Sequence, residues 1–345
     1  MSKPDIDSLT RADSWAGVHV HVAGFGVAGR AATDNLNHLG ATVVAVDEDV
    51  AVRDGAEAAE FTERAELMNV LGAEVRIGAG VADVLPDDVD VLVVSPGWAS
   101  DHPLVEQAHV RGVPVWGEVE LAWRLRDPEH DVPWLAVTGS RGRGRVVRMT
   151  ESILRTEGLR TAVAGNGALS PIEIVMEPDP YDVVVLDLSA AQLHHTFSMS
   201  AESALVTGMG PLDAHEHPQW YSSFEEYSAD TARVYHQVRK ACIFNVVDER
   251  TMTMVEEADV VEGARAIGFT VGMPAVSMVG LVEEILADRA FIAQRSTSAA
   301  ELCTLEDLGV HEPEYVLDAL AAATLARSHG VSQVAVRDGL RAFHA

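Results

Sequence analysis

The hydrophobic positions in the first third of the chain follow a strand and helix order. Residues 18–23 (VHVHVA) alternate in the manner of a strand, a glycine-rich turn follows, and a helical pattern then continues through Leu39. The apolar run at 41–48 completes a βαβ unit of about 30 residues. Further elements are predicted in the same order, with strands at 73–80 and 89–97, a helix near 104–111 and a strand at 113–117. Strands that alternate with helices predict an α/β fold with a parallel, doubly wound sheet.

A polar stretch with two prolines, RDPEHDVP at 126–133, separates this pattern from a second one and is predicted to link two domains. Strands are expected in the second part at 134–139, 181–189, 202–208 and 240–246, with a weaker candidate at 264–271. The chain closes with two helical stretches, 314–331 and 332–345. We therefore predict two domains, residues 1–127 and 128–345.

Length and composition agree with a globular protein of this kind. A chain of 345 residues is too long for one ordinary core, and 48% hydrophobic with 23% charged residues is typical of globular proteins. The sequence contains no run of about 18 apolar residues, so no membrane span is predicted. The polar N-terminus does not resemble a signal peptide. Cys242 and Cys303 are the only cysteines, so we expect no disulfide framework and a cytoplasmic protein.

The formal net charge of −28 argues against nucleic acid as a partner. The single basic cluster consists of Arg141, Arg143, Arg145 and Arg148. These arginines could hold an anion at a helix N-terminus, or they could form a solvated surface.

A first glycine loop follows the first predicted strand. Gly24, Gly26 and Gly29 give the spacing GxGxxG, and Asp47 ends a strand about 20 residues later. Glycine at these positions permits a tight turn and a close approach of the backbone to a diphosphate. The spacing is shared by dinucleotide and nucleotide-sugar sites, and a glycine turn without a ligand is the alternative. Asp47 is then either a ligand or an ordinary strand-end residue.

A second glycine loop, VTGSRGRGRVV at 137–147, has the strand, turn and helix setting of a phosphate cradle. Where such loops carry Gly-Lys followed by Ser or Thr, this chain has Gly142, Arg143 and Gly144. Arginine is larger and forked, so it does not simply replace a phosphate-binding lysine. Gly144 also lacks the hydroxyl that would hold Mg²⁺. We therefore expect a loop that no longer supports ATP chemistry.

Taken together, these segments resemble the Mur ligases, and most closely the actinobacterial ligases that add D-glutamate. The resemblance covers nearly the whole chain and rests on GFGVAGR, SPGWASDHP, VPVWGEVELAWR, AVTGSRG, ESILRTEGLRTAVAGN, DLSAAQL, SMSAESA, FEEYSAD and DVVEGARAIGF, in this order. It implies a Rossmann-like domain that binds a UDP-sugar, followed by a P-loop-like ATPase domain. Such ligases use ATP to convert a carboxylate of the UDP-sugar into an acyl phosphate, which an amino acid then attacks. The family's third domain is expected to be absent, because the resemblance ends at FHA.

The resemblance also implies which residues form the sites. On the UDP-sugar side they are Gly24, Gly26, Val27, Ala28, Gly29, Asp47, Ser95, Pro96, Gly97 and Asn166. On the ATP side the cofactor loop comprises Gly139, Ser140, Gly142 and Arg143, and the remnants of the catalytic set are Arg143, Asp187 and His217.

Several departures from the family pattern fall on the ATP chemistry. Asp187 stands where the family has a glutamate that helps bind Mg²⁺, and Thr231 stands where it has a carbamylated lysine. The base-binding motif at 314–320 has lost its histidine and both asparagines, whereas scaffold residues such as Tyr227 and Tyr235 are retained. We therefore expect a non-catalytic paralogue without a cofactor, with ATP and Mg²⁺ relevant only if activity remains.

Alternatives remain open at this point. The paralogue would bind a UDP-N-acetylmuramoyl-type sugar, or a partner such as a Mur ligase or another cell-wall protein. A working ligase whose third domain comes from a separate chain, a dinucleotide-dependent enzyme, and recruitment to a specialised pathway are the others. A metal could in principle bind the loop residues Asp213, His215, Glu216 and His217, but solvated histidines are the simpler interpretation and no metal site is predicted.

Overall fold

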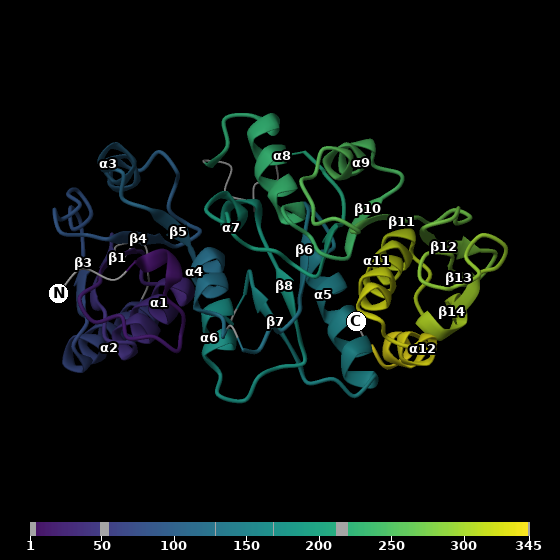
Figure 1. The fold of residues 1–345 in the computed structure, drawn as a ribbon, viewed down its shortest axis with the longest axis horizontal. Coiled ribbons are helices and arrows are strands. Elements are labelled where there is room, and N and C mark those ends of the chain that lie inside the picture. The colour runs from purple at the N-terminus through teal and green to yellow at the C-terminus, as the bar shows by residue number, and fades with distance from the viewer. Residues whose placement is uncertain (1–4, 49–54, 128, 168, 212–219, 344–345) are drawn as a thin grey trace. The chain divides into compact units, whose positions relative to one another are not determined.

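The computed structural model describes residues 5–48, 55–127, 129–167, 169–211 and 220–343 (Figure 1). The chain divides into two compact units. Unit 1 comprises Met1–Asp131, Ala168–Pro178 and His194–Ser198, and unit 2 comprises Val132–Gly167, Asp179–Leu193 and Met199–Ala345. Two short segments that follow the predicted linker in sequence therefore pack with unit 1.

Unit 1 is built on a five-stranded parallel sheet with the order β3-β2-β1-β4-β5. The strands are β1 (His19–Ala23), β2 (Thr42–Asp47), β3 (Glu74–Ile77), β4 (Val91–Val94) and β5 (Val115–Gly117). The strand order reverses between β1 and β4. Ligands of such sheets bind beyond the carboxyl ends of the strands at this switch point.

Helices cover both faces of this sheet (Figure 1). The helices of unit 1 are α1 (Val27–His38), α2 (Gly55–Leu71), α3 (Pro103–Arg111), α4 (Glu118–Leu125) and α6 (Pro171–Met176), with a 3-10 turn, η1, at Ile6–Ser8. Of these, α6 packs on α4 and α1. Figure 1 shows α1 and α2 on one side of the strands and α3 on the other. Leu92 and Val94 of β4 pack against Leu104 and Val105 of α3. The α/β fold predicted from the alternating pattern is confirmed.

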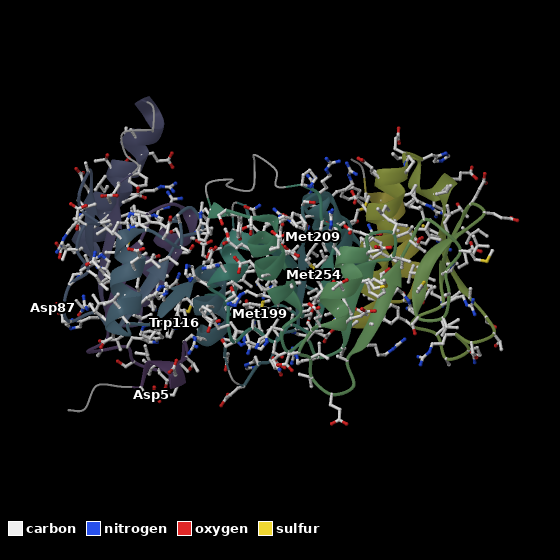
Figure 2. The ribbon with its side chains drawn as sticks, turned by 90° about the horizontal axis from the view of Figure 1, so that it is seen from above. Asp5, Asp87, Trp116, Met199, Met209 and Met254 are labelled. Atoms are coloured by element: carbon white, nitrogen blue, oxygen red, sulfur yellow. The ribbon has the colours of Figure 1, made fainter. Side chains whose placement is uncertain are left out.

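Side chains of α4 and of the strand before it, β5, make specific packing and hydrogen-bond contacts in unit 1. Trp116, labelled in Figure 2, is buried, and the Arg124 guanidinium carbon lies 4.4 Å from the centroid of its ring. The buried Glu120 carboxylate accepts hydrogen bonds from the backbone amides of Phe197 (2.7 Å) and Ser198 (2.9 Å). These bonds attach the segment 194–198 to unit 1.

Unit 2 contains a nine-stranded sheet with the order β14-β13-β12-β11-β10-β9-β6-β8-β7. Its strands are β6 (Trp134–Thr138), β7 (Thr161–Gly165), β8 (Val183–Asp187), β9 (Ser203–Val206), β10 (Ala241–Asn245), β11 (Arg265–Phe269), β12 (Met278–Val282), β13 (Ile285–Asp288) and β14 (Ala300–Thr304). The pairings are parallel from β7 to β12, and β12–β14 form an antiparallel extension.

The helices of unit 2 are α5 (Arg143–Thr156), α7 (Ala190–His194), α8 (Phe224–Ala232), α9 (Glu249–Glu256), α10 (Leu305–Leu308), α11 (Pro313–His329) and α12 (Gln333–Ala342), with a 3-10 turn, η4, at Arg233–Tyr235. The helices α5, α11 and α12 share one large hydrophobic core with the sheet. A Cβ atom at Gly339 would lie 2.5 Å from the Cα of Ile153, so glycine is required where α12 crosses α5. Within the described residues, no helix is long and apolar enough to cross a membrane.

Candidate functional site

The first glycine loop connects β1 to α1, and its glycines serve different purposes. A Cβ atom at Gly24, whose φ is +97°, would lie 2.6 Å from Ser95 Oγ and 2.8 Å from Trp98 Nε1. A Cβ atom at Gly29 would lie 1.9 Å from the Gly24 carbonyl oxygen. Packing inside unit 1 therefore requires both of these glycines. At Gly26, by contrast, a Cβ atom would meet no described atom within 4 Å, so this glycine faces open space.

Asp47 is brought to this loop by β2. Its buried Oδ2 accepts a hydrogen bond from the Phe25 amide at 2.6 Å, so the carboxylate holds the loop backbone. Ser95 follows β4, and its amide donates to the Ala23 carbonyl at 2.9 Å, which places Ser95, Pro96 and Gly97 beside the loop. Val27 and Ala28 begin α1, with Val27 38% exposed and Ala28 buried.

Asn166, predicted for the same substrate site, lies in unit 2. It follows β7, and its amide donates to the Asp187 carbonyl at 2.7 Å. The structure thus gathers the other predicted sugar-nucleotide residues in unit 1, and Asn166 lies beside the end of β8.

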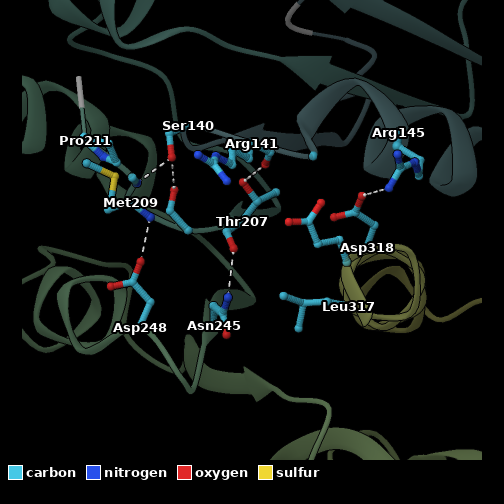
Figure 3. Close-up of a pocket in the computed structure, with 14 residues that line it drawn as sticks. Ser140, Arg141, Arg145, Thr207, Met209, Pro211, Asn245, Asp248, Leu317 and Asp318 are labelled. Atoms are coloured by element: carbon cyan, nitrogen blue, oxygen red, sulfur yellow. Dashed lines mark hydrogen bonds and ion pairs between the residues drawn. The ribbon is translucent and has the colours of Figure 1, made fainter. Parts of the chain in front are cut away.

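The second glycine loop connects β6 to α5, and Ser140, Arg141 and Gly142 of this loop line a pocket (Figure 3). The buried strand β6 leads into it, and Gly139 and Gly142 both have positive φ values, +120° and +76°. The Ser140 hydroxyl accepts from the Gly210 amide at 2.6 Å, and the Thr207 hydroxyl donates to the Arg141 carbonyl at 2.6 Å. These bonds hold the loop against the segment that follows β9.

Arg143, at the position of the expected lysine, is committed to contacts inside unit 2. Its Nε lies 2.9 Å from Asp187 Oδ1, and its Nη1 donates to the Gly139 carbonyl at 2.8 Å. The side chains are only 10% and 12% exposed. A buried ion pair of this kind is costly to break, because each partner would leave an uncompensated charge behind.

The residues present do not fit a magnesium nucleotide of the P-loop type. Gly144 offers no hydroxyl for the metal, and the Asp187 carboxylate already pairs with Arg143. A Cβ atom at Gly144 would lie 4.0 Å from Asp187 Oδ2, so a threonine there would place its hydroxyl beside that carboxylate. The chain therefore has neither the hydroxyl nor an unpaired carboxylate at this point.

A cavity of about 420 Å³ lies next to the second glycine loop. It is lined by the loop, by the segment after β9, by Asn245 and Asp248, and by Glu314, Leu317 and Asp318 of α11 (Figure 3). Arg145 Nη1 lies 2.7 Å from Asp318 Oδ2. Burial raises the pKa of the Asp318 carboxyl to about 6, although the Arg145 guanidinium opposes this shift.

The remaining predicted positions fall in three places. Thr231 is fully buried, and its hydroxyl donates to the Tyr227 carbonyl of its own helix at 2.8 Å. The retained Tyr235 is buried and donates to the Ile243 carbonyl at 2.6 Å. His217, with Asp213, His215 and Glu216, lies outside the described residues. Across the part of the chain that is described, no group of three or more His, Cys, Asp or Glu side chains could hold a metal ion.

Comparisons with known proteins identify the family. No family model matches the chain. The UDP-N-acetylmuramoylalanine–D-glutamate ligase of Streptomyces avermitilis is 46% identical over 330 residues, which are 96% of this chain and 68% of that relative. The ligase of the same name from Streptomyces coelicolor is 46% identical over 331 residues, 95% of this chain and 68% of that relative. The chain belongs to the Mur ligase family.

The resemblance predicted from the sequence motifs is thereby confirmed, including the D-glutamate-adding branch. Among solved structures, the Mur ligase family UDP-N-acetylmuramate:L-alanyl-γ-D-glutamyl-meso-diaminopimelate ligase from Neisseria is similar with a TM-score of 0.59 at 15% identity, covering 96% of this chain and 99% of that one. A murein peptide ligase from Psychrobacter arcticus has a TM-score of 0.54 at 12% identity, covering 95% of this chain and 69% of that one. At these identities the similarity shows a shared fold. The predicted site residues and the absence of a third domain stay predictions.

Proposed function

We propose that this Mur ligase family chain is a non-catalytic paralogue that binds a UDP-N-acetylmuramoyl-type nucleotide sugar, or a partner protein, in the synthesis of cell-wall precursors. The observation that carries the proposal is the buried pair of Arg143 and Asp187. The family resemblance implies a catalytic role at both positions. In this chain the two side chains instead form an ion pair with each other.

The chemical reasoning concerns the transferred phosphoryl group. In P-loop enzymes a lysine reaches the phosphates and a Ser or Thr hydroxyl holds Mg²⁺. Arg143 is drawn toward Asp187 and Gly139, and Gly144 has no side chain. Removing one preorganised group of this type commonly costs about 3 kcal/mol of transition-state stabilisation. The combined changes support loss of ligation.

The first glycine loop supports retention of a ligand site in unit 1. It is held by Asp47 and by the segment after β4, and Gly26 keeps open space at the start of α1. Backbone amides at a helix N-terminus suit a diphosphate. The same proposal places the protein in the cytoplasm, which agrees with two buried cysteines that are both unpaired.

A second candidate is an active ligase that joins UDP-N-acetylmuramoyl-L-alanine to D-glutamate through an acyl phosphate. It is favoured by 46% identity, across 96% of this chain, to a relative that carries the ligase name. The positive charge of Arg143 and the carboxylate of Asp187 also remain at their positions.

Calorimetric titration and a phosphate-release assay separate the two candidates. The purified protein is titrated with UDP-N-acetylmuramoyl-L-alanine and, separately, with ATP and Mg²⁺. It is then assayed for phosphate release in the presence of UDP-N-acetylmuramoyl-L-alanine, ATP, Mg²⁺ and D-glutamate together. Binding of the sugar nucleotide without ATP binding or phosphate release supports the paralogue. Phosphate release that depends on D-glutamate would establish the ligase instead. A Gly26→Val variant serves as the control for specific binding of the sugar nucleotide, since its side chain would fill the open space.

A further inference from the structure

The phosphate loop carries more positive charge than a P-loop ordinarily does, and carboxylates from elsewhere in unit 2 meet that charge. Arg143 pairs with Asp187 at the end of β8, and Arg145 pairs with Asp318 on α11. Asp318 comes from a helix about 170 residues further along the chain, as the separation of 173 between the two paired residues shows. Its role at the loop is not explained by the loss of catalysis alone.

Asp318 lies beside Gly142 of the loop as well as pairing with Arg145. A Cβ atom at Gly142 would lie 2.3 Å from Asp318 Oδ1 and 3.1 Å from Oδ2. Gly142 has a φ of +76° and is the N-cap of α5, where no side chain caps the helix. A side chain at Gly142 would therefore collide with the Asp318 carboxylate.

The surroundings of this contact fix the carboxylate. The side chain of Asp318 is 11% exposed, and the Arg145 guanidinium carbon lies 5.3 Å from the centroid of the Tyr315 ring on the same helix. Burial opposes the charged form and raises the pKa of Asp318 to about 6. The carboxylate of Asp318, which belongs to α11, nevertheless lies beside the N-terminus of α5. A negative charge there interacts favourably with the helix dipole.

We propose that Asp318 is a resident anion of the phosphate loop, which holds the loop and the start of α5 in place of a bound phosphate. This inference goes beyond the proposed function, because it concerns what keeps the loop ordered and closed to external anions. It predicts that the wild-type loop is ordered without any ligand and does not respond to phosphate. Replacing the carboxylate by an amide removes the negative charge that repels an added anion and supplies an N–H donor, so the loop should then accept one.

The test is hydrogen–deuterium exchange of the full chain at pH 7.5, read on peptides that cover residues 139–146, with and without millimolar inorganic phosphate. In the wild type we expect slow exchange that phosphate does not change. In Asp318→Asn we expect exchange about tenfold faster, because a hydrogen bond between charged groups is lost, and phosphate should slow it again. Asp338→Asn, which removes a half-exposed carboxylate on α12 that pairs with Arg337, is the matched control and should behave as the wild type at residues 139–146.

A second variant keeps the inference testable if Asp318→Asn does not fold. Arg145→Gln loosens the contact but leaves the carboxylate against Gly142, so exchange should be faster and phosphate should not slow it. Unchanged exchange in Asp318→Asn, a phosphate effect in the wild type equal to that in Asp318→Asn, or slowing of the Arg145→Gln exchange by phosphate would overturn the proposal. None of these readouts depends on ligation, so activity that refuted the proposed function would leave this result standing.

Discussion

The Nε atom of Arg143 lies 2.9 Å from Oδ1 of Asp187. Arg143 also donates to the Gly139 carbonyl, so this ion pair is attached to the second glycine loop. Arg143 belongs to the first turn of α5 and Asp187 is the last residue of β8, so the pair joins the start of a helix to the end of an interior strand of the sheet. The same two positions are those at which the family resemblance implied catalytic remnants.

Removing Arg143 should destabilise unit 2. In Arg143→Ala the nearly buried Asp187 carboxylate would lose its partner, and we expect the free energy of unfolding to fall by about 3 kcal/mol. Urea unfolding followed by circular dichroism measures this change. Asp187→Asn should cost a similar amount, and the double variant should cost clearly less than the sum of the two. Additive costs would show that the pair does not act as a unit.

Much of the fold could be predicted from the sequence because its strands are continuous apolar runs separated by glycine turns. Five of the strands of unit 2 followed from such runs, including the buried β6 and β8. Among the strands, two features were missed. β7 is a short run of small residues, TAVAG, and the strands β12–β14 contain acidic residues and a glycine that weaken the strand pattern.

The candidate site was predicted only in part. The spacing of glycines located both loops, since backbone geometry depends on local sequence. The contact of Asp318 with Gly142 could not be found in the same way, because it joins residues that are distant along the chain and meet only after α11 packs on α5. The only sign of this contact in the sequence is that Asp318, a charged residue, stands within an alanine-rich helical stretch.

A buried histidine should make unit 1 sensitive to acid. His21 on β1 is 1% exposed, and its ring nitrogens have no hydrogen-bond partner within the described residues. Burial, assisted by the charge of Arg76, lowers the pKa of His21 from 6.5 to about 4. Because the folded pKa is depressed, the neutral ring contributes full stability above pH 6.5, and this is lost as the pH falls toward 4.

The loss should amount to about 3 kcal/mol between pH 6.5 and 4. Urea midpoints at several pH values measure it, and His21→Leu is the comparison because leucine cannot take up a proton. Carboxylates titrate in both proteins, so the difference between the two curves isolates the histidine. Parallel curves would show that His21 is not protonated at the expense of the fold.

Glu120 should hold the segment 194–198 on unit 1. Its carboxylate accepts from two backbone amides, from the Ser198 hydroxyl at 2.8 Å and from Arg124 Nε at 2.6 Å. In Glu120→Ala these donors lose their acceptor, and we expect a loss of about 3 kcal/mol in the stability of unit 1. Hydrogen exchange at Phe197 and Ser198 should become faster. The exposed Glu129 offers a control, since Glu129→Ala should change neither quantity.

Two glycines of the first loop should respond in opposite ways to the same substitution. Gly24→Ala introduces a Cβ atom 2.6 Å from Ser95 Oγ on a residue with a φ of +97°, so we expect a destabilisation of about 2 kcal/mol. Gly26→Ala introduces its Cβ into open space, so stability should change by less than about 1 kcal/mol.

Gly26→Ala should weaken binding of the sugar nucleotide, although it leaves the protein folded. If Gly26 faces the diphosphate, a methyl group there obstructs the approach of the ligand to the backbone amides at the start of α1, and affinity should fall at least tenfold. Thermal unfolding and calorimetric titration of the two variants provide both measurements. Gly26→Ala with wild-type affinity would remove this loop from the binding site, whereas weakened binding at full stability would assign the ligand to the switch point of the unit 1 sheet.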